Sequence, residues 1–167
     1  MARVLSIELG HSVVKICEME HNAKKTKIYQ CQEVITPKGA VMDGYIVDAK
    51  LKDLAYAIKE TIARNGIKTK KVIYTVASAK IINREVTVPA VKEAQISSVI
   101  QANLGEYFPV SLADYEVTQS LIQTIADGAD AGKHRVLVFA AEKAMLESYR
   151  KLAAACELDI VNVCCSG

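Results

Sequence analysis

Runs of apolar residues at the start of the chain predict a meander of strands. Hydrophobic runs at residues 3–9 and 12–19 lie on either side of a polar corner at Gly10, and this corner suits a tight hairpin. A third strand is predicted at about 27–35, after a polar turn. The loop at 36–45 is then the one sizeable irregular stretch, and its length is ordinary.

An amphipathic helix is predicted over residues 49–65, where apolar side chains recur at the i, i+3, i+4, i+7 spacing. Asp48 is placed to cap its first turn, and Asn65 with Gly66 is placed to end it in a left-handed residue. A strand rich in β-branched residues follows at 71–77. Meander, helix and strand together predict one α/β unit.

A second unit is predicted to begin near residue 83. An alternating strand at 83–89 ends at Pro89, because proline cannot extend a ladder of strands. A helix is predicted over about 92–107, and two strands follow at 114–125 and 134–141, joined by a Gly-rich turn. The predicted order in this unit is strand, helix, strand, strand.

The last part of the chain predicts one more helix, over 142–158, and the start of another strand at 159–167. The predicted apolar face of this helix consists of Leu146, Tyr149, Leu152, Ala153 and Cys156. The sequence stops directly after an apolar strand. We therefore expect the chain to be a piece of a longer protein.

Composition and charge describe an ordinary folded protein. Apolar residues make up 51% and charged residues 24% of the chain, which differs from the low hydrophobicity and high charge of disordered chains. A formal net charge of +2 is too small for a nucleic-acid footprint, and a chain without Trp offers little aromatic surface for stacking. We interpret the basic clusters at 24–27 and 68–71 as solvated turns, and His21 and His134 as solvated side chains.

The cysteines predict a reducing, cytoplasmic environment. There are five, an odd number without the CxxC spacing of a zinc site, and most lie in apolar runs where a free cysteine acts as a small hydrophobic residue. They are Cys17, Cys31, Cys156, Cys164 and Cys165.

No signal peptide or membrane span is predicted. The apolar run at the N-terminus is short and contains Glu8, and no segment approaches the roughly 18 to 20 apolar residues that span a bilayer. Any membrane association is therefore expected to go through a partner.

The polar corner "ELGHSVVK" at residues 8–15 is the first candidate for chemistry. Backbone N–H groups of such a turn can hold phosphate oxygens, Ser12 can add a hydroxyl, and Lys15 can add a positive point charge. The pattern alone leaves an ordinary hairpin open, in which Gly10 serves only the turn and Lys15 extends into solvent.

The order of the elements resembles the opening of the actin-like ATPase superfamily, whose phosphate-facing hairpin has the form Asp-x-Gly-x-x-x-x-Lys. The segments "INREVTVP" and "FPVSL", with the flanking sequence, resemble the PilM family, FtsA-like proteins of type IV pilus assembly. This resemblance covers essentially the whole chain. It implies an α/β fold with an actin-like (ribonuclease H-like) first subdomain at 1–83, an inserted FtsA/PilM-type subdomain of order strand-helix-strand-strand at 84–158, and a return strand at 159–167, truncated there.

The resemblance also implies partners and ligands. Such a protein is cytoplasmic and peripheral at the inner face of the cytoplasmic membrane, and it captures the cytoplasmic N-terminal peptide of the inner-membrane protein PilN. In the full-length protein ATP and Mg are implied, with the phosphates at Gly10, His11, Ser12 and Lys15 and the magnesium held through water by Glu8. Glu8 stands where the family has Asp, which shifts the carboxylate near a metal that demands exact geometry. The resemblance also implies that the second phosphate loop and the adenine pocket come from later sequence, so this fragment alone is not expected to bind ATP tightly or to hydrolyse it.

Other interpretations stay open at this point. The hairpin also suits an actin-superfamily ATPase or half of a small-molecule kinase, although no carboxylate lies in a recognisable base motif. The cell-division protein FtsA has the same architecture. Self-association is left open, whereas no nucleic-acid partner is expected.

Overall fold

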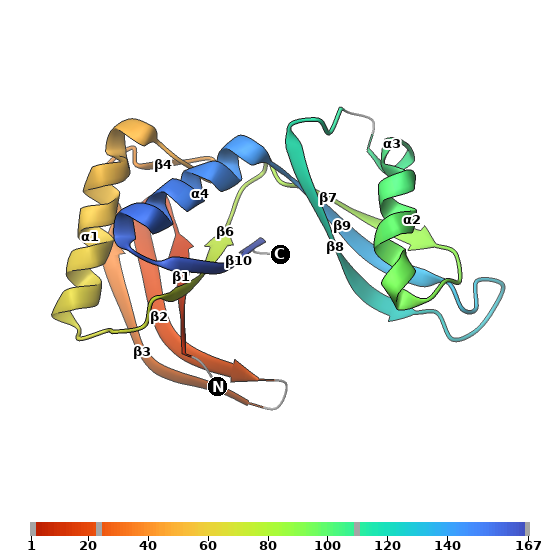
Figure 1. Ribbon diagram of the computed structural model, residues 1–167, viewed down its shortest axis with the longest axis horizontal. Coiled ribbons are helices and arrows are strands. Elements are labelled where there is room, and N and C mark those ends of the chain that lie inside the picture. The colour runs from red at the N-terminus through yellow and green to blue at the C-terminus, as the bar shows by residue number, and fades with distance from the viewer. Residues whose placement is uncertain (1–2, 23–24, 109–110, 166–167) are drawn as a thin grey trace. The chain divides into compact units, whose positions relative to one another are not determined.

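The structure is a computed structural model that describes residues 3–22, 25–108 and 111–165 (Figure 1). The chain forms two compact units. Unit 1 comprises the described residues of 1–80 and 144–167, and unit 2 comprises those of 81–143. No helix among the described residues is long and apolar enough to cross a membrane.

Unit 1 is built on a five-stranded sheet of order β10-β6-β1-β2-β3. Strands β1, β2 and β3 form an antiparallel meander, as predicted, and β6 runs parallel to both β1 and β10. The strands are β1 (Val4–Leu9), β2 (Val13–Asn22), β3 (Lys25–Ile35), β6 (Lys71–Val76) and β10 (Asp159–Cys165). The helical segments of this unit are η1 (Asp48–Lys50), α1 (Leu51–Arg64) and α4 (Lys143–Cys156).

One face of this sheet is buried and the other is not. Along β1, β2 and β6 the fully buried side chains alternate with partly exposed ones, as a sheet covered on one side requires. The Tyr74 ring of β6 meets the Tyr149 ring of α4 edge to face at 5.4 Å, and Cys156 of α4 lies 3.8 Å from the Ala55 carbonyl of α1. Helices α1 and α4 therefore share the core of unit 1.

The position of α4 differs from the sequence prediction. The predicted boundary at 158 placed this helix in the inserted unit, but its buried residues pack within unit 1. The Ser148 hydroxyl accepts a hydrogen bond from the Ile46 N–H at 3.2 Å. Met145 and Ser148 belong to its buried face, whereas the predicted Leu146 is only half-buried. The apolar stripe of a helix marks the face that is buried, but it does not say which sheet the helix covers.

The predicted irregular loop at 36–45 contains a small hairpin. Its strands are β4 (Val41–Met42) and β5 (Tyr45–Ile46), and the turn residues Asp43 and Gly44 have φ values of 49° and 83°. A turn with both central residues in the left-handed region suits the twist of a two-residue hairpin, and Asp-Gly is a preferred sequence for it. A Cβ on Gly44 would lie 2.6 Å from the Ser78 Cβ, so the hairpin packs tightly against the chain just beyond β6.

The predicted N-terminal cap of α1 is wrong, whereas its predicted C-terminal stop is confirmed. Asp48 does not cap the helix, because it lies in η1 and its carboxylate is 3.0 Å from the Lys151 ammonium. The predicted C-terminal stop is confirmed: Gly66 has φ +65°, and the N–H of Ile67 bonds the Ile62 carbonyl at 3.0 Å. This is the bonding pattern of a Schellman motif.

Unit 2 is a three-stranded antiparallel sheet of order β7-β9-β8 with helical segments packed on it. Its elements are β7 (Ile82–Val88), η2 (Glu93–Gln95), α2 (Ile96–Ala102), α3 (Leu104–Tyr107), β8 (Tyr115–Thr124) and β9 (His134–Glu142). The single predicted helix is interrupted at Asn103, whose side-chain amide donates to the Val99 carbonyl at 2.7 Å. A side chain that donates a hydrogen bond to this carbonyl competes with the regular backbone hydrogen bond of the helix.

The prediction that both histidines are solvated is confirmed for His21 and wrong for His134. His21 is exposed, as expected, but His134 is buried at the start of β9. Its Nε2 donates to the Val91 carbonyl at 2.7 Å, so its Nδ1 accepts from the Thr124 hydroxyl at 2.9 Å. His134 therefore ties two strands of unit 2 to the segment before α2.

The predictions for the basic clusters and for the cysteines are each confirmed only in part. The described lysines of both clusters are exposed, as predicted, but the prediction of turns is wrong for Lys25 and Lys27 in β3 and for Lys71 in β6. Lys24 lies outside the described residues. The prediction of free cysteines was wrong for two of them, because Cys17 of β2 and Cys31 of β3 form a disulfide. The register places the two residues directly opposite each other, which depends on pairing that the sequence alone does not reveal.

Candidate functional site

The predicted phosphate hairpin lies at the end of a central strand of unit 1. The parallel strands β1, β6 and β10 run in the same direction, and the β1–β2 turn begins where β1 ends. In open α/β sheets, ligands bind outside the carboxyl ends of such strands. The turn is therefore at the edge of the sheet where a ligand site is expected.

Gly10 is required by a close approach of the backbone. Its N–H bonds the Val13 carbonyl at 3.0 Å, and a Cβ built on Gly10 would lie 2.5 Å from the same oxygen. A side chain at this position would collide with a backbone atom that the turn itself holds in place. Gly10 therefore shapes the turn, as predicted.

Thr36, which the sequence analysis did not single out, holds the turn from the next strand. Its hydroxyl donates to the Gly10 carbonyl at 2.8 Å, and its backbone N–H donates to the Ser12 carbonyl at 3.0 Å. Within the described residues, the backbone N–H groups of His11 and Ser12 have no hydrogen-bond partner. A turn whose carbonyls already accept hydrogen bonds and whose neighbouring amides are free has the arrangement that an anion-binding nest needs.

The His11 ring is held away from the free amides. Its Nδ1 lies 3.2 Å from the Val41 carbonyl of β4, and it is the donor because a carbonyl oxygen only accepts. We therefore expect the contribution of His11 to an anion site to come from its backbone N–H. The imidazole links the turn to the β4–β5 hairpin.

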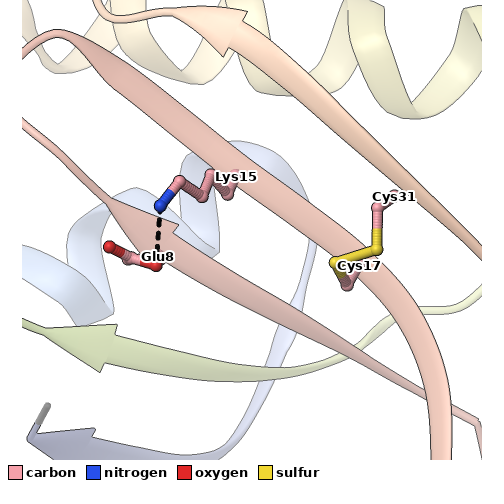
Figure 2. The surroundings of a disulfide bond; sticks show 4 residues. All are labelled: Glu8, Lys15, Cys17 and Cys31. Atoms are coloured by element: carbon pink, nitrogen blue, oxygen red, sulfur yellow. Dashed lines mark ion pairs between the residues drawn. A yellow bond between two sulfur atoms is a disulfide. The ribbon is translucent and has the colours of Figure 1, made fainter. Parts of the chain in front are cut away.

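Glu8 and Lys15 face each other across β1 and β2 (Figure 2). The Lys15 ammonium is 3.5 Å from a Glu8 carboxylate oxygen, and the side chains are 54% and 45% exposed. An ion pair this exposed contributes little to stability, so Lys15 can turn toward an anion at small cost. In the alternative of an ordinary hairpin, Lys15 extends into solvent; here its side chain is about half exposed and is also paired with Glu8.

The site fits a phosphate group better than it fits a magnesium ion. The turn offers free amides, the Ser12 hydroxyl and the Lys15 ammonium. Glu8 is already paired with Lys15, and no group of three or more His, Cys, Asp or Glu side chains in the described residues is arranged to hold a metal. The described residues therefore supply part of a phosphate site.

A second polar feature lies at the opposite end of the same strands. Glu18 is buried, and its carboxylate accepts hydrogen bonds from Thr69 at 2.6 Å and from Gln30 at 3.1 Å. Arg3 lies 3.6 Å from it. The hydrogen bond from Thr69, then that from Gln30, lowers the pKa of Glu18 below its usual value. A cavity of about 420 Å³ opens here, lined by Arg3, Glu18, Gln30, Gly66, Lys68 and Thr69.

The Glu18 network gives unit 1 a pH-dependent stability. Because its pKa is lower in the folded chain, Glu18 stabilises the fold above its unfolded pKa, and this contribution is lost as the pH falls through the folded pKa. At neutral pH, Glu18→Ala should cost about 1–3 kcal/mol of unfolding free energy, because Thr69 and Gln30, which are partly buried, lose a charged acceptor. Urea unfolding at neutral and acidic pH measures both effects. Glu147→Gln, at an exposed carboxylate of α4 outside this network, is the control and should leave the unfolding free energy at neutral pH close to that of the wild type.

A protein-family model matches most of the chain. A family model described as type IV pilus assembly protein PilM matches residues 6–164. A sequence search among curated proteins finds no match.

Two solved structures share the fold of this chain. A chain of the PilM-PilN type IV pilus biogenesis complex matches with a TM-score of 0.80 at 19% identity, over 97% of this chain and 47% of that one. The cytoplasmic domain of EpsL, an inner-membrane component of the type II secretion system of Vibrio cholerae, matches with a TM-score of 0.56 at 12% identity, over 98% and 57%. This chain thus spans about half the length of these proteins. The likeness, the sheet order and the division into two units confirm the predicted α/β fold with its inserted unit.

Proposed function

We propose that this chain, which belongs to the PilM family of type IV pilus assembly proteins, is the first half of a scaffold for pilus assembly. Its task in that scaffold is to hold the N-terminal cytoplasmic peptide of a PilN-type protein of the inner membrane. The family match over residues 6–164 carries the proposal, and the likeness to a chain of a PilM-PilN complex supports it. Membership of this family leaves FtsA and a small-molecule kinase without support.

The peptide is expected to bind in an extended form. Such a segment can add to the free edge of a sheet, where main-chain hydrogen bonds give affinity and side-chain pockets give specificity. Strands β3 and β10 are the outer strands of the sheet in unit 1, and β7 and β8 are the outer strands in unit 2. Each unit therefore offers backbone groups suited to this kind of recognition.

We propose nucleotide binding only for a longer protein that contains this chain. The free amides at His11 and Ser12, with Lys15 beside them, would hold phosphate oxygens of ATP. ATP bound there would add a charged ligand that bridges this turn to residues beyond the chain. No hydrolytic step is proposed.

The proposed location is the cytoplasmic face of the inner membrane. The protein would be held there by the peptide of its partner, because no helix among the described residues is suited to spanning the bilayer. Release of the peptide should therefore release the protein from the membrane fraction.

Deletion of the gene that encodes this chain tests the role in pilus assembly. We expect surface pili to be lost while the pilin subunit is still made, since a scaffold acts after synthesis of the subunit. Immunoblots of sheared surface fractions and of whole cells measure the two quantities. Normal surface pili in the deletion strain would contradict the proposed role.

A further inference from the structure

We propose that Cys17 and Cys31 form a reversible redox site, and that its state is passed along β3 to the β1–β2 turn. The redox chemistry and the link to the turn are argued from unit 1 alone.

The sheet itself brings the two cysteines together. Cys17 and Cys31 are directly opposed in the antiparallel β2–β3 ladder, and their Cα atoms are 4.2 Å apart. Such a short distance is typical of the pairs that do not exchange backbone hydrogen bonds, whose side chains lie closest. The ladder continues on both sides, with Lys15 opposite Glu33 and Glu18 opposite Gln30. The two thiols of the reduced protein therefore stay adjacent without help from the disulfide.

The pair is accessible to small reagents. Cys31 is exposed on β3, the outer strand of the sheet, while Cys17 is half-buried on β2 (Figure 2). Cys156 differs, because it is buried in the core of unit 1 and burial raises the pKa of its thiol to about 11. At neutral pH it stays protonated and does not compete as a nucleophile.

The chemistry is thiol–disulfide exchange with a small thiol such as glutathione. One glutathione thiolate attacks the exposed Cys31 sulfur, the S–S bond breaks, and the Cys17 sulfur leaves as a thiolate that takes up a proton. A second glutathione thiolate then attacks the glutathione sulfur of the mixed disulfide, and the Cys31 sulfur leaves as a thiolate that is protonated. The protein gains two electrons and two protons, and two glutathione molecules leave as one oxidised glutathione. Oxidised glutathione reverses the sequence.

Strand β3 connects this pair to the candidate phosphate turn. Thr36 directly follows β3 and makes the two hydrogen bonds that hold the carbonyls of Gly10 and Ser12. As an outer strand of the sheet, β3 has β2 as its one strand partner among the described residues and is otherwise in contact with α1, so the β2–β3 ladder and the disulfide within it hold much of its position. Reduction removes the covalent link. The outer strand then opens more often, and each opening releases Thr36 from the turn.

Amide exchange measured by mass spectrometry tests the link without any nucleotide. The chain is equilibrated with graded ratios of reduced and oxidised glutathione, and alkylation reports the fraction of Cys17–Cys31 disulfide. We expect a reversible two-electron transition in the folded chain. In the reduced form, peptides covering 10–13 and 32–36 should exchange at least about ten-fold faster, whereas peptides from unit 2 should not change.

Two variants sharpen the test. Thr36→Val keeps a β-branched side chain but loses the hydroxyl, so reduction should change exchange at 10–13 less than in the wild type. Cys164→Ser, at an exposed free cysteine, is the control and should behave as the wild type does. Equal exchange at 10–13 in both redox states, or a disulfide that glutathione reduces only on unfolding, would overturn the proposal. Neither result bears on peptide or nucleotide binding, so failure here is separate from failure of the proposed function.

Discussion

Tyr149→Ala is expected to lower the unfolding free energy of unit 1 by about 3–5 kcal/mol, the usual cost of truncating a large buried aromatic residue. Tyr149 is fully buried on α4, and its ring meets Tyr74 of β6 edge to face. Truncation leaves a cavity between helix and sheet and removes that ring contact. Urea unfolding measures the total loss. Amide exchange in peptides covering β6 shows where the loss occurs.

Tyr149→Phe is the matched control, because it keeps the ring. Within the described residues the buried hydroxyls of Tyr149 and Tyr74 have no hydrogen-bond partner, so removing one hydroxyl should cost little or should stabilise the fold. Faster exchange in β8 and β9, with β6 unchanged, would contradict the assignment of α4 to unit 1.

Gly10→Ala is expected to disturb both stability and the candidate phosphate site. The new Cβ would lie 2.5 Å from the Val13 carbonyl oxygen, so the turn must move. Strain of this kind costs about 1–3 kcal/mol in well-packed regions. In the full-length protein, ATP binding should weaken at least about ten-fold, because a lost hydrogen bond to a charged group is worth about 1.5–3 kcal/mol. Calorimetric titration with ATP and magnesium measures the second effect.

Gly105→Ala is the control for this substitution. Nothing lies within 4 Å of a Cβ built on Gly105, and the residue is in α3, where alanine is the better helix former. We expect a gain of up to about 1 kcal/mol in stability and no change in ATP binding. Equal losses in Gly10→Ala and Gly105→Ala would show that the turn does not depend on the close approach at Gly10.

Patterns that repeat within one element could be predicted from the sequence. The meander, the extent of α1 and its stop at Gly66, and the order of elements in unit 2 all follow from local periodicity and turn residues. The partner of α4 and the pairing of Cys17 with Cys31 could not be predicted in this way. Both depend on residues distant in sequence that meet only when the sheet has formed.

The candidate site was predictable to a similar extent. Gly10 and Lys15 stand in a recognisable pattern, and the structure brings them together on adjacent strands with Glu8. Thr36 carries no local signal, because its role comes from hydrogen bonds to a turn on another strand pair. The bond that turns the His11 ring toward Val41 likewise depends on a hairpin in a segment that reads as irregular.

The central claim is that this chain holds the cytoplasmic N-terminus of a PilN-type protein. The most direct measurement is a fluorescence anisotropy titration of the labelled N-terminal peptide with the 167-residue chain, in the absence of nucleotide. A scrambled peptide of the same composition is the control. The account predicts saturable binding of one peptide per chain and no binding of the scrambled peptide. Equal binding of the two peptides, or no binding by the folded chain, would contradict it.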